Sequence, residues 1–229
     1  TDSGGYDFFA DCLADPQFAL AVVQQHDGLC ELALRICNCW SEATAEMLSR
    51  VLADWTKIKV RFFSKVAPCQ LTAIRISRGD QHKHGRSVAV LEFSSGRKLV
   101  YKPRPLAVEK EFAQFARWFN SESGEQLLSY VKVLDVGRYG WCEFVEQCAV
   151  DRLDGIELYY RRIGALIAAS RILGLTDLHS ENLVASGDMP VIGDLETLFH
   201  PLTVDLFPQT WPSRAEAQLA RMADESVQA

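Results

Sequence analysis

The chain has 229 residues, of which 48% are hydrophobic, and it carries a net charge of −6 with a pI of about 5.4. This length and apolar content are enough for one large domain or for two lobes that share a cleft. The acidic balance argues against a nucleic-acid partner held through its phosphates, and no apolar run is long enough to span a bilayer.

The seven cysteines are odd in number and lack the paired C-x-x-C spacing of a zinc or redox site. Cys37 and Cys39 fall within a helical apolar pattern, which predicts small core residues rather than reactive thiols. This cysteine usage fits a reducing compartment, so we predict a cytoplasmic protein.

Residues 1–66 form a predicted N-terminal helical region. Their apolar residues recur at spacings of three and four, as on one face of an α-helix. Ser41 followed by Glu42 predicts a helix start at this point, although the full capping box is absent. The region contains no residues that suggest chemistry, and we expect it to pack against the next part of the chain or to hold a partner.

Residues 67–148 are predicted to form a unit built on an antiparallel sheet, because the apolar period changes here from helical to alternating. In the first strand, Leu71 and Ala73 are expected on one face, and Ile74 and Ile76 on the other. Five strands are predicted, at 71–77, 87–93, 97–102, 131–136 and 141–145. One helix, at 108–120, lies between the third and the fourth strand. Protein kinases build their upper lobe in this order.

The hairpin between the first two strands suggests a phosphate site. It carries Asp80 and His82 between Gly79 and Gly85, and it would lie over the expected cleft. Taken alone, such a tip is a solvated turn. Over a cleft, His82 is able to donate to a phosphate oxygen or to act as an acid or base near neutral pH.

Lys102 ends the third strand, where kinases place the lysine that contacts the nucleotide phosphates. A surface lysine at a strand end is the ordinary alternative, but the apolar residues Val100 and Tyr101 precede it. The next helix carries Glu109 and Glu111 near its start, where the helix dipole favours acids in any case. Either glutamate is able to pair with Lys102, and we favour Glu109.

Residues 149–229 are predicted to form a partial lower lobe, and they contain the strongest signal in the sequence. Asp177 and Asn182 are five residues apart, which is the spacing of the Asp and Asn in the kinase catalytic loop. A short β-hairpin then returns the chain, so that Asp194 lies at the same mouth. These groups suit acceptance of a hydroxyl proton and binding of Mg²⁺, whereas a solvated polar loop is the alternative. Beyond them, Ser213 opens a predicted final helix.

Four motifs, in order, read Gly-Asp-Gln-His-Lys-His-Gly-Arg-Ser-Val (79–88), Tyr-Lys-Pro-Arg-Pro-Leu (101–106), Thr-Asp-Leu-His-Ser-Glu-Asn (176–182) and Asp-Leu-Glu-Thr-Leu-Phe (194–199). This set resembles the dehydratase domain of class II (LanM-type) lanthipeptide synthetases, and four separated motifs in order make the match specific. The resemblance implies an α+β, lipid-kinase-like fold with two lobes. It also implies an enzyme that uses ATP and Mg²⁺ to phosphorylate Ser and Thr of a precursor peptide, and then eliminates the phosphate to leave dehydroalanine or dehydrobutyrine.

The resemblance implies roles for individual residues as well. Lys102 would contact the nucleotide phosphates beneath the hairpin of Gly79 and Gly85, and Asp177 would orient or deprotonate the peptide hydroxyl. Magnesium would be bound by two residues with the support of a third, namely Asn182, Asp194 and Glu196. Three more residues lie at positions that the family uses around the phosphoryl group: Asp80, His82 and His179.

Members of this family continue for many hundreds of residues, with part of the elimination machinery and a zinc-dependent cyclase domain beyond the matching region. The chain begins at Thr1 rather than Met, which suggests a fragment or a processed product. Because it stops at Ala229 and offers no candidate for the cyclase zinc site, the resemblance identifies it with the ATP-binding portion of such an enzyme. Its expected partner is a precursor peptide with leader and core, and we expect it alone to leave phosphorylated rather than dehydrated peptide. Two alternatives stay open: a small-molecule kinase of the aminoglycoside or choline type, and a non-catalytic peptide-binding fragment.

Overall fold

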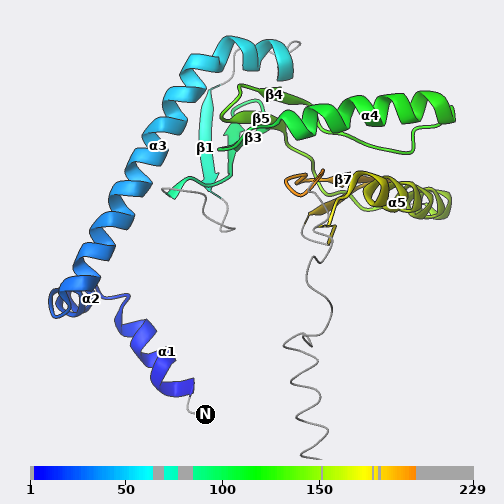
Figure 1. The fold of residues 1–229 in the computed structure, drawn as a ribbon. Coiled ribbons are helices and arrows are strands. Elements are labelled where there is room, and N and C mark those ends of the chain that lie inside the picture. Colours follow the sequence, from blue (N-terminus) through cyan, green and yellow to red (C-terminus); the bar gives the residue numbers. More distant parts are fainter. Residues whose placement is uncertain are drawn as a thin grey trace, which may run out of the picture.

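The computed structural model describes residues 3–63, 70–76, 85–150, 152–176, 178–179 and 182–199. Three helices come first, and a five-stranded sheet, two more helices and a hairpin follow (Figure 1). None of the helices in these segments combines the length and the apolar character that a membrane crossing requires. Some predictions fall outside these segments and stay predictions; they concern Gly79, Asp80, His82, Asp177 and the final helix from Ser213.

The predicted N-terminal helical region consists of α1 (Ser3–Cys12), α2 (Pro16–Gln24) and α3 (Asp27–Phe62). Helix α2 begins at a proline, whose fixed φ suits the first helical position. The carboxylate of Asp15 caps it and accepts the backbone N–H of Gln17 at 2.7 Å. The start of α2 is therefore determined by local sequence.

Helix α3 is continuous over 36 residues, which corresponds to about 54 Å. The predicted helix start at Ser41 is therefore wrong. No glycine or proline interrupts the segment after Gly28, so nothing favours a break strongly enough. Met47, Val51 and Ile58 lie buried on one face of the same helix, and this packing outweighs the preference of one serine for a cap.

The sheet contains β1 (Leu71–Ile76), β2 (Ala89–Phe93), β3 (Lys98–Lys102), β4 (Val133–Asp135) and β5 (Gly140–Glu143). Its strand order is β1-β2-β3-β5-β4, and all neighbours are antiparallel. The predicted five-stranded antiparallel sheet is confirmed, with strand ends that differ by a few residues.

The first strand departs from simple alternation. The pairing of β1 with β2 shifts between Leu71 and Ala73, so the strand carries a bulge. A bulge adds one residue and reverses the faces on either side of it. Leu71 and Ile74 consequently pack against the same core, and the prediction that they lie on opposite faces is wrong.

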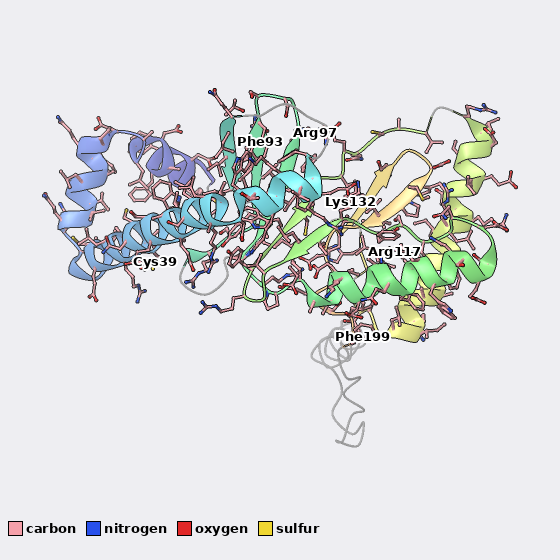
Figure 2. The ribbon with its side chains drawn as sticks, turned by 90° about the horizontal axis from the view of Figure 1, so that it is seen from above. Cys39, Phe93, Arg97, Arg117, Lys132 and Phe199 are labelled. Carbon is pink, nitrogen blue, oxygen red and sulfur yellow. The ribbon has the colours of Figure 1, made fainter. Side chains whose placement is uncertain are left out.

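One face of the sheet packs against the C-terminal half of α3. Met47 and Ile58 of the helix share a buried cluster with Leu91, Leu99 and Trp141 of the strands. Figure 2 shows α3 above the strands, with Phe93 labelled in the sheet. This core therefore covers the face of the sheet that lies against α3 and leaves the opposite face for the candidate site described below.

The remaining elements are α4 (Ala107–Ser123), α5 (Leu153–Leu173), β6 (Leu183–Ser186) and β7 (Met189–Ile192). They share a second core, to which α4 contributes the apolar face that its sequence predicts, including the buried Phe112. In Figure 1, α4 and α5 lie one above the other, and β7 lies at the end of α5 that is nearer to the sheet. Helix α4 therefore joins the sheet to the hairpin.

The N-terminal half of α3 extends beyond the sheet (Figure 1) and exposes apolar side chains such as Trp40. Cys37 is exposed and Cys39 is half-buried, so the prediction that both are core residues is wrong. Cys39, labelled in Figure 2, is one of the residues that line an open pocket of about 360 Å³ between α3 and the sheet. The apolar period of α3 is correct, but the strands cover only part of the helix.

Candidate functional site

Lys102, the last residue of β3, lies at the centre of the candidate site. Leu99 and Tyr101 face the core under α3, so alternation directs Val100 and Lys102 to the opposite face. The ammonium group donates a hydrogen bond to the carbonyl oxygen of Gly193 at 2.7 Å. Lys102 is only 5% exposed, so it is not the surface lysine that the sequence left open.

Two carboxylates lie 3.5 Å from the Lys102 ammonium nitrogen, those of Glu109 and Asp194. Glu109 is in the first turn of α4 and is buried. Glu111 is exposed and accepts a hydrogen bond from Gln114 instead. The structure therefore pairs Lys102 with the glutamate that the sequence favours.

Arg104 also belongs to this cluster, although the sequence analysis gives it no role. Its Nη2 lies 2.7 Å from Glu109 Oε1 and 2.5 Å from Asp194 Oδ1, and its Nε lies 2.8 Å from Glu196 Oε1. Burial disfavours the charged guanidinium, but the contacts with these carboxylates outweigh burial and raise the pKa of Arg104 above its ordinary value. The only sequence signal for Arg104 is its place in the rigid Pro-Arg-Pro segment directly after Lys102.

Asp194 follows β7 after a single glycine. Its Oδ1 accepts the backbone N–H of Glu196 at 3.0 Å. Burial raises its pKa, but the positive charges of Lys102 and Arg104 outweigh burial, and the pKa of Asp194 lies below its ordinary value. The carboxylate is therefore held ionised, in the form that binds a metal.

The hairpin brings Asn182 next to Asp194, as the sequence predicts. Leu183 pairs with Ile192, and the carbonyl oxygen of Asn182 accepts the N–H of Gly193 at 2.7 Å. His179 is exposed, and its Nε2 lies 3.3 Å from the side-chain nitrogen of Asn182. Asn182 of the predicted catalytic loop thus lies beside the backbone that leads into Asp194, and His179 lies next to Asn182.

Gly85 does not join this cluster. It has a φ of +72° and lies against Cys39 of α3, in the pocket that Tyr101 also lines. The structure places it at the α3 face of the sheet, whereas the side chain of Lys102 lies on the other face. Its predicted role in cofactor binding stays a prediction.

The described residues include no group of three or more His, Cys, Asp or Glu side chains that is arranged to hold a metal. Magnesium, however, is commonly bound by one or two carboxylates together with substrate phosphates and water. Asp194, Glu196 and the amide of Asn182 supply oxygen donors of this kind. The residues present therefore fit Mg²⁺, provided that a phosphate completes the coordination.

The cluster is not fully satisfied as it stands. Glu109 Oε2 and Arg104 Nε are both buried and have no hydrogen-bond partner within the described part of the chain. Arg104 Nε does form an ion pair with Glu196, but this contact lacks hydrogen-bond geometry. Buried polar atoms without partners are uncommon in folded proteins. They mark this cluster as a place where an additional group would gain hydrogen bonds.

Comparison with known proteins points to one biosynthetic context. A curated protein from Lactococcus lactis subsp. lactis, "Lacticin 481/lactococcin biosynthesis protein LcnDR2", is 36% identical over 132 residues. This similarity covers 54% of the chain but only 14% of the relative's length. The family described as "Domain of unknown function (DUF4135)" matches residues 28–229. The chain therefore belongs to the DUF4135 family, which is found in lanthionine synthetase-like proteins.

Proposed function

We propose that this part of the protein performs the ATP- and Mg²⁺-dependent phosphorylation of Ser and Thr in a ribosomally made precursor peptide. In this proposal phosphorylation is the first step of dehydration in lanthipeptide biosynthesis. The observation that carries it is the cluster in which Lys102 lies 3.5 Å from both Glu109 and Asp194. Kinases use a strand lysine, a helical glutamate and a metal-binding aspartate in the same way.

A kinase-like fold with two lobes is part of the proposal. It is supported by the order of elements, in which a five-stranded antiparallel sheet with α4 is followed by α5 and the β6–β7 hairpin. The residues of the cluster come from the sheet, from α4 and from the end of the hairpin. A nucleotide between these parts would contact all three.

Each residue of the cluster has a chemical task in this proposal. Lys102 binds phosphate oxygens as a point charge, and Glu109 holds it in position. Asp194 and Asn182 bind the metal, with Glu196 beside them, and the metal neutralises the charge of the phosphates. Asp177 accepts the proton of the peptide hydroxyl, and Asp80, His82 and His179 act around the phosphoryl group.

Binding of the nucleotide is the first test. Calorimetric titration of the protein with ATP, with and without Mg²⁺, is expected to give binding that depends on the metal. Lys102→Gln is expected to weaken it by tenfold or more, since a charged contact with phosphate is lost. Lys132→Gln is the matched control, because this lysine is exposed and directly precedes β4, outside the cluster (Figure 2).

Phosphoryl transfer is the second test. The protein is incubated with precursor peptide, ATP and Mg²⁺, and the peptide mass shows either an added phosphate or the loss of water. Transfer to aminoglycosides or choline instead of peptide would favour a small-molecule kinase. A folded protein that binds no nucleotide at all would overturn the proposal and leave a peptide-binding role.

A further inference from the structure

Among the described cations, Arg104 makes the shortest contacts with the carboxylates that are proposed to bind the metal. Its guanidinium lies 2.5 Å from Asp194 Oδ1 and its Nε 2.8 Å from Glu196 Oε1, whereas Lys102 lies 3.5 Å from Asp194 Oδ2. The Arg104 side chain is only 11% exposed. Its charge is therefore applied to these oxygens with little screening by water.

A divalent cation at the same oxygens would meet this guanidinium. Two cations at the Asp194 carboxylate would repel each other, and the low exposure of the Arg104 side chain limits how far water screens this repulsion. Either the metal binds weakly or Arg104 moves away. The ion pair of Arg104 Nε with Glu196 lacks hydrogen-bond geometry, so moving the guanidinium gives up no hydrogen bond at this nitrogen.

We propose that Arg104 is a positioning residue that substitutes for the divalent cation in the metal-free protein, keeping Asp194 and Glu196 in place until the metal displaces it. The inference rests on the proposed function for the identity of the metal site. It adds that the metal site carries its own internal competitor, which none of the motifs identifies.

A displaced Arg104 would remain near the site, because it is only two residues from Lys102 and follows a proline. A guanidinium binds phosphate oxygens in a bidentate manner. The nucleotide phosphates would therefore stabilise the displaced guanidinium, and nucleotide and metal would favour each other's binding. The protein then binds metal weakly by itself and well in the presence of nucleotide.

The decisive measurement uses Mn²⁺ alone, with the full chain and no nucleotide, followed by electron paramagnetic resonance of the free ion. Arg104→Gln removes the competing guanidinium. The variant is expected to bind Mn²⁺ about tenfold more tightly than the wild type, because the metal no longer has to displace a charged hydrogen bond. Arg104→Lys keeps the charge but is too short and single-pronged to hold both carboxylates, so it is expected to show part of the gain. Unchanged or weaker Mn²⁺ binding in both variants would overturn the inference.

Two further variants separate displacement from a general change of charge. Arg152→Gln removes an exposed arginine that pairs with Asp154, and its Mn²⁺ affinity is expected to equal that of the wild type. Lys102→Gln removes a cation that contacts Asp194 but not Glu196, so its gain is expected to be smaller than that of Arg104→Gln. Equal gains for Lys102→Gln and Arg104→Gln would show that only net charge matters, and would contradict the inference.

A second titration, with a non-hydrolysable ATP analogue present, separates this inference from the proposed function. In the wild type the analogue is expected to raise Mn²⁺ affinity by a larger factor than in Arg104→Gln. A wild type that does not bind the analogue would overturn the proposed function, whereas the nucleotide-free comparison would still decide the role of Arg104. Circular dichroism checks that each variant is folded. If Arg104→Gln does not fold, the Mn²⁺ affinity of Arg104→Lys decides the role of Arg104.

Discussion

Asp54 of α3 accepts a hydrogen bond from the indole nitrogen of Trp141 in β5, at 3.1 Å, although the two residues are 87 positions apart. The same carboxylate oxygen accepts the hydroxyl of Tyr139 at 2.7 Å. Trp141 pairs with Tyr101 in the sheet, directly before Lys102. The helix without evident chemistry thus anchors the strand that carries the central lysine of the site.

Asp54→Ala is expected to lower the free energy of unfolding by about 3 kcal/mol, because it leaves the buried indole N–H of Trp141 and the half-buried hydroxyl of Tyr139 without their charged acceptor. Urea denaturation followed by tryptophan fluorescence measures the change. Asp154→Ala is the control, since that carboxylate is exposed and should change stability by no more than about 0.5 kcal/mol. A loss equal to that of the control would show that the Asp54 contacts do not stabilise the fold.

The contribution of Asp54 is expected to depend on pH. Burial raises its pKa, but the hydrogen bonds from Tyr139, Trp141 and Lys57 outweigh burial and hold the pKa below its ordinary value. The unfolded chain therefore takes up the proton at a higher pH than the folded chain. The stabilisation is complete above about pH 4 and is lost as the pH falls through the folded pKa.

The measurement is a comparison of wild type with Asp54→Asn in urea at several pH values. The difference between their free energies of unfolding is expected to shrink from neutral pH to about pH 3. A difference that stays constant over this range would contradict the pKa shift.

Gly140→Ala is expected to destabilise the protein by about 2 kcal/mol through overpacking. A methyl group at this position would collide with the side chain of Leu106 and lie 2.8 Å from the carbonyl oxygen of Leu134. Gly140 pairs with Lys102, so nucleotide affinity should fall together with stability. Gly164→Ala is the matched control: no atom lies near the added methyl group in α5, and alanine favours the helix, so stability should be equal or higher.

Cys142 is expected to be the slowest of the described cysteines to react. Burial of its thiol raises its pKa to about 12, whereas Cys37 and Cys148 are exposed. Limited alkylation of the native protein, followed by peptide mass spectrometry, should find Cys37 and Cys148 labelled first. Cys142 is expected to be labelled readily only after denaturation. Rapid labelling in the native protein would contradict the prediction and show that the sheet opens near the site.

Much of the site was predictable because its signals are local. The alternation of β3 and its end at Pro103 place Lys102 on the face opposite the core, and the helix that follows places Glu109 near it. Arg104 was not predictable in the same way, because two of its partners, Asp194 and Glu196, lie about ninety residues away. Ion pairs between distant segments leave no period or spacing in a sequence.

The fold shows the same division between local and distant causes. The five strands follow from alternation and turns, whereas the bulge after Leu71 depends on how β1 pairs with β2. The predicted helix start at Ser41 is wrong because the capping preference of one serine is weak compared with the stability of a long uninterrupted helix. The exposure of Cys37 depends on how far the strands extend along α3, which periodicity does not encode.

The hydrogen bond from Lys102 to the Gly193 carbonyl joins the sheet to the hairpin before any ligand is present. The two sides of the site are consequently preorganised, and the ordering of Lys102 takes place during folding of the chain rather than during binding. Preorganised sites lose less conformational entropy when a ligand arrives. If Lys102 binds phosphates as proposed, their affinity is set by the exchange of one oxygen partner for another around an ammonium group that is already in position.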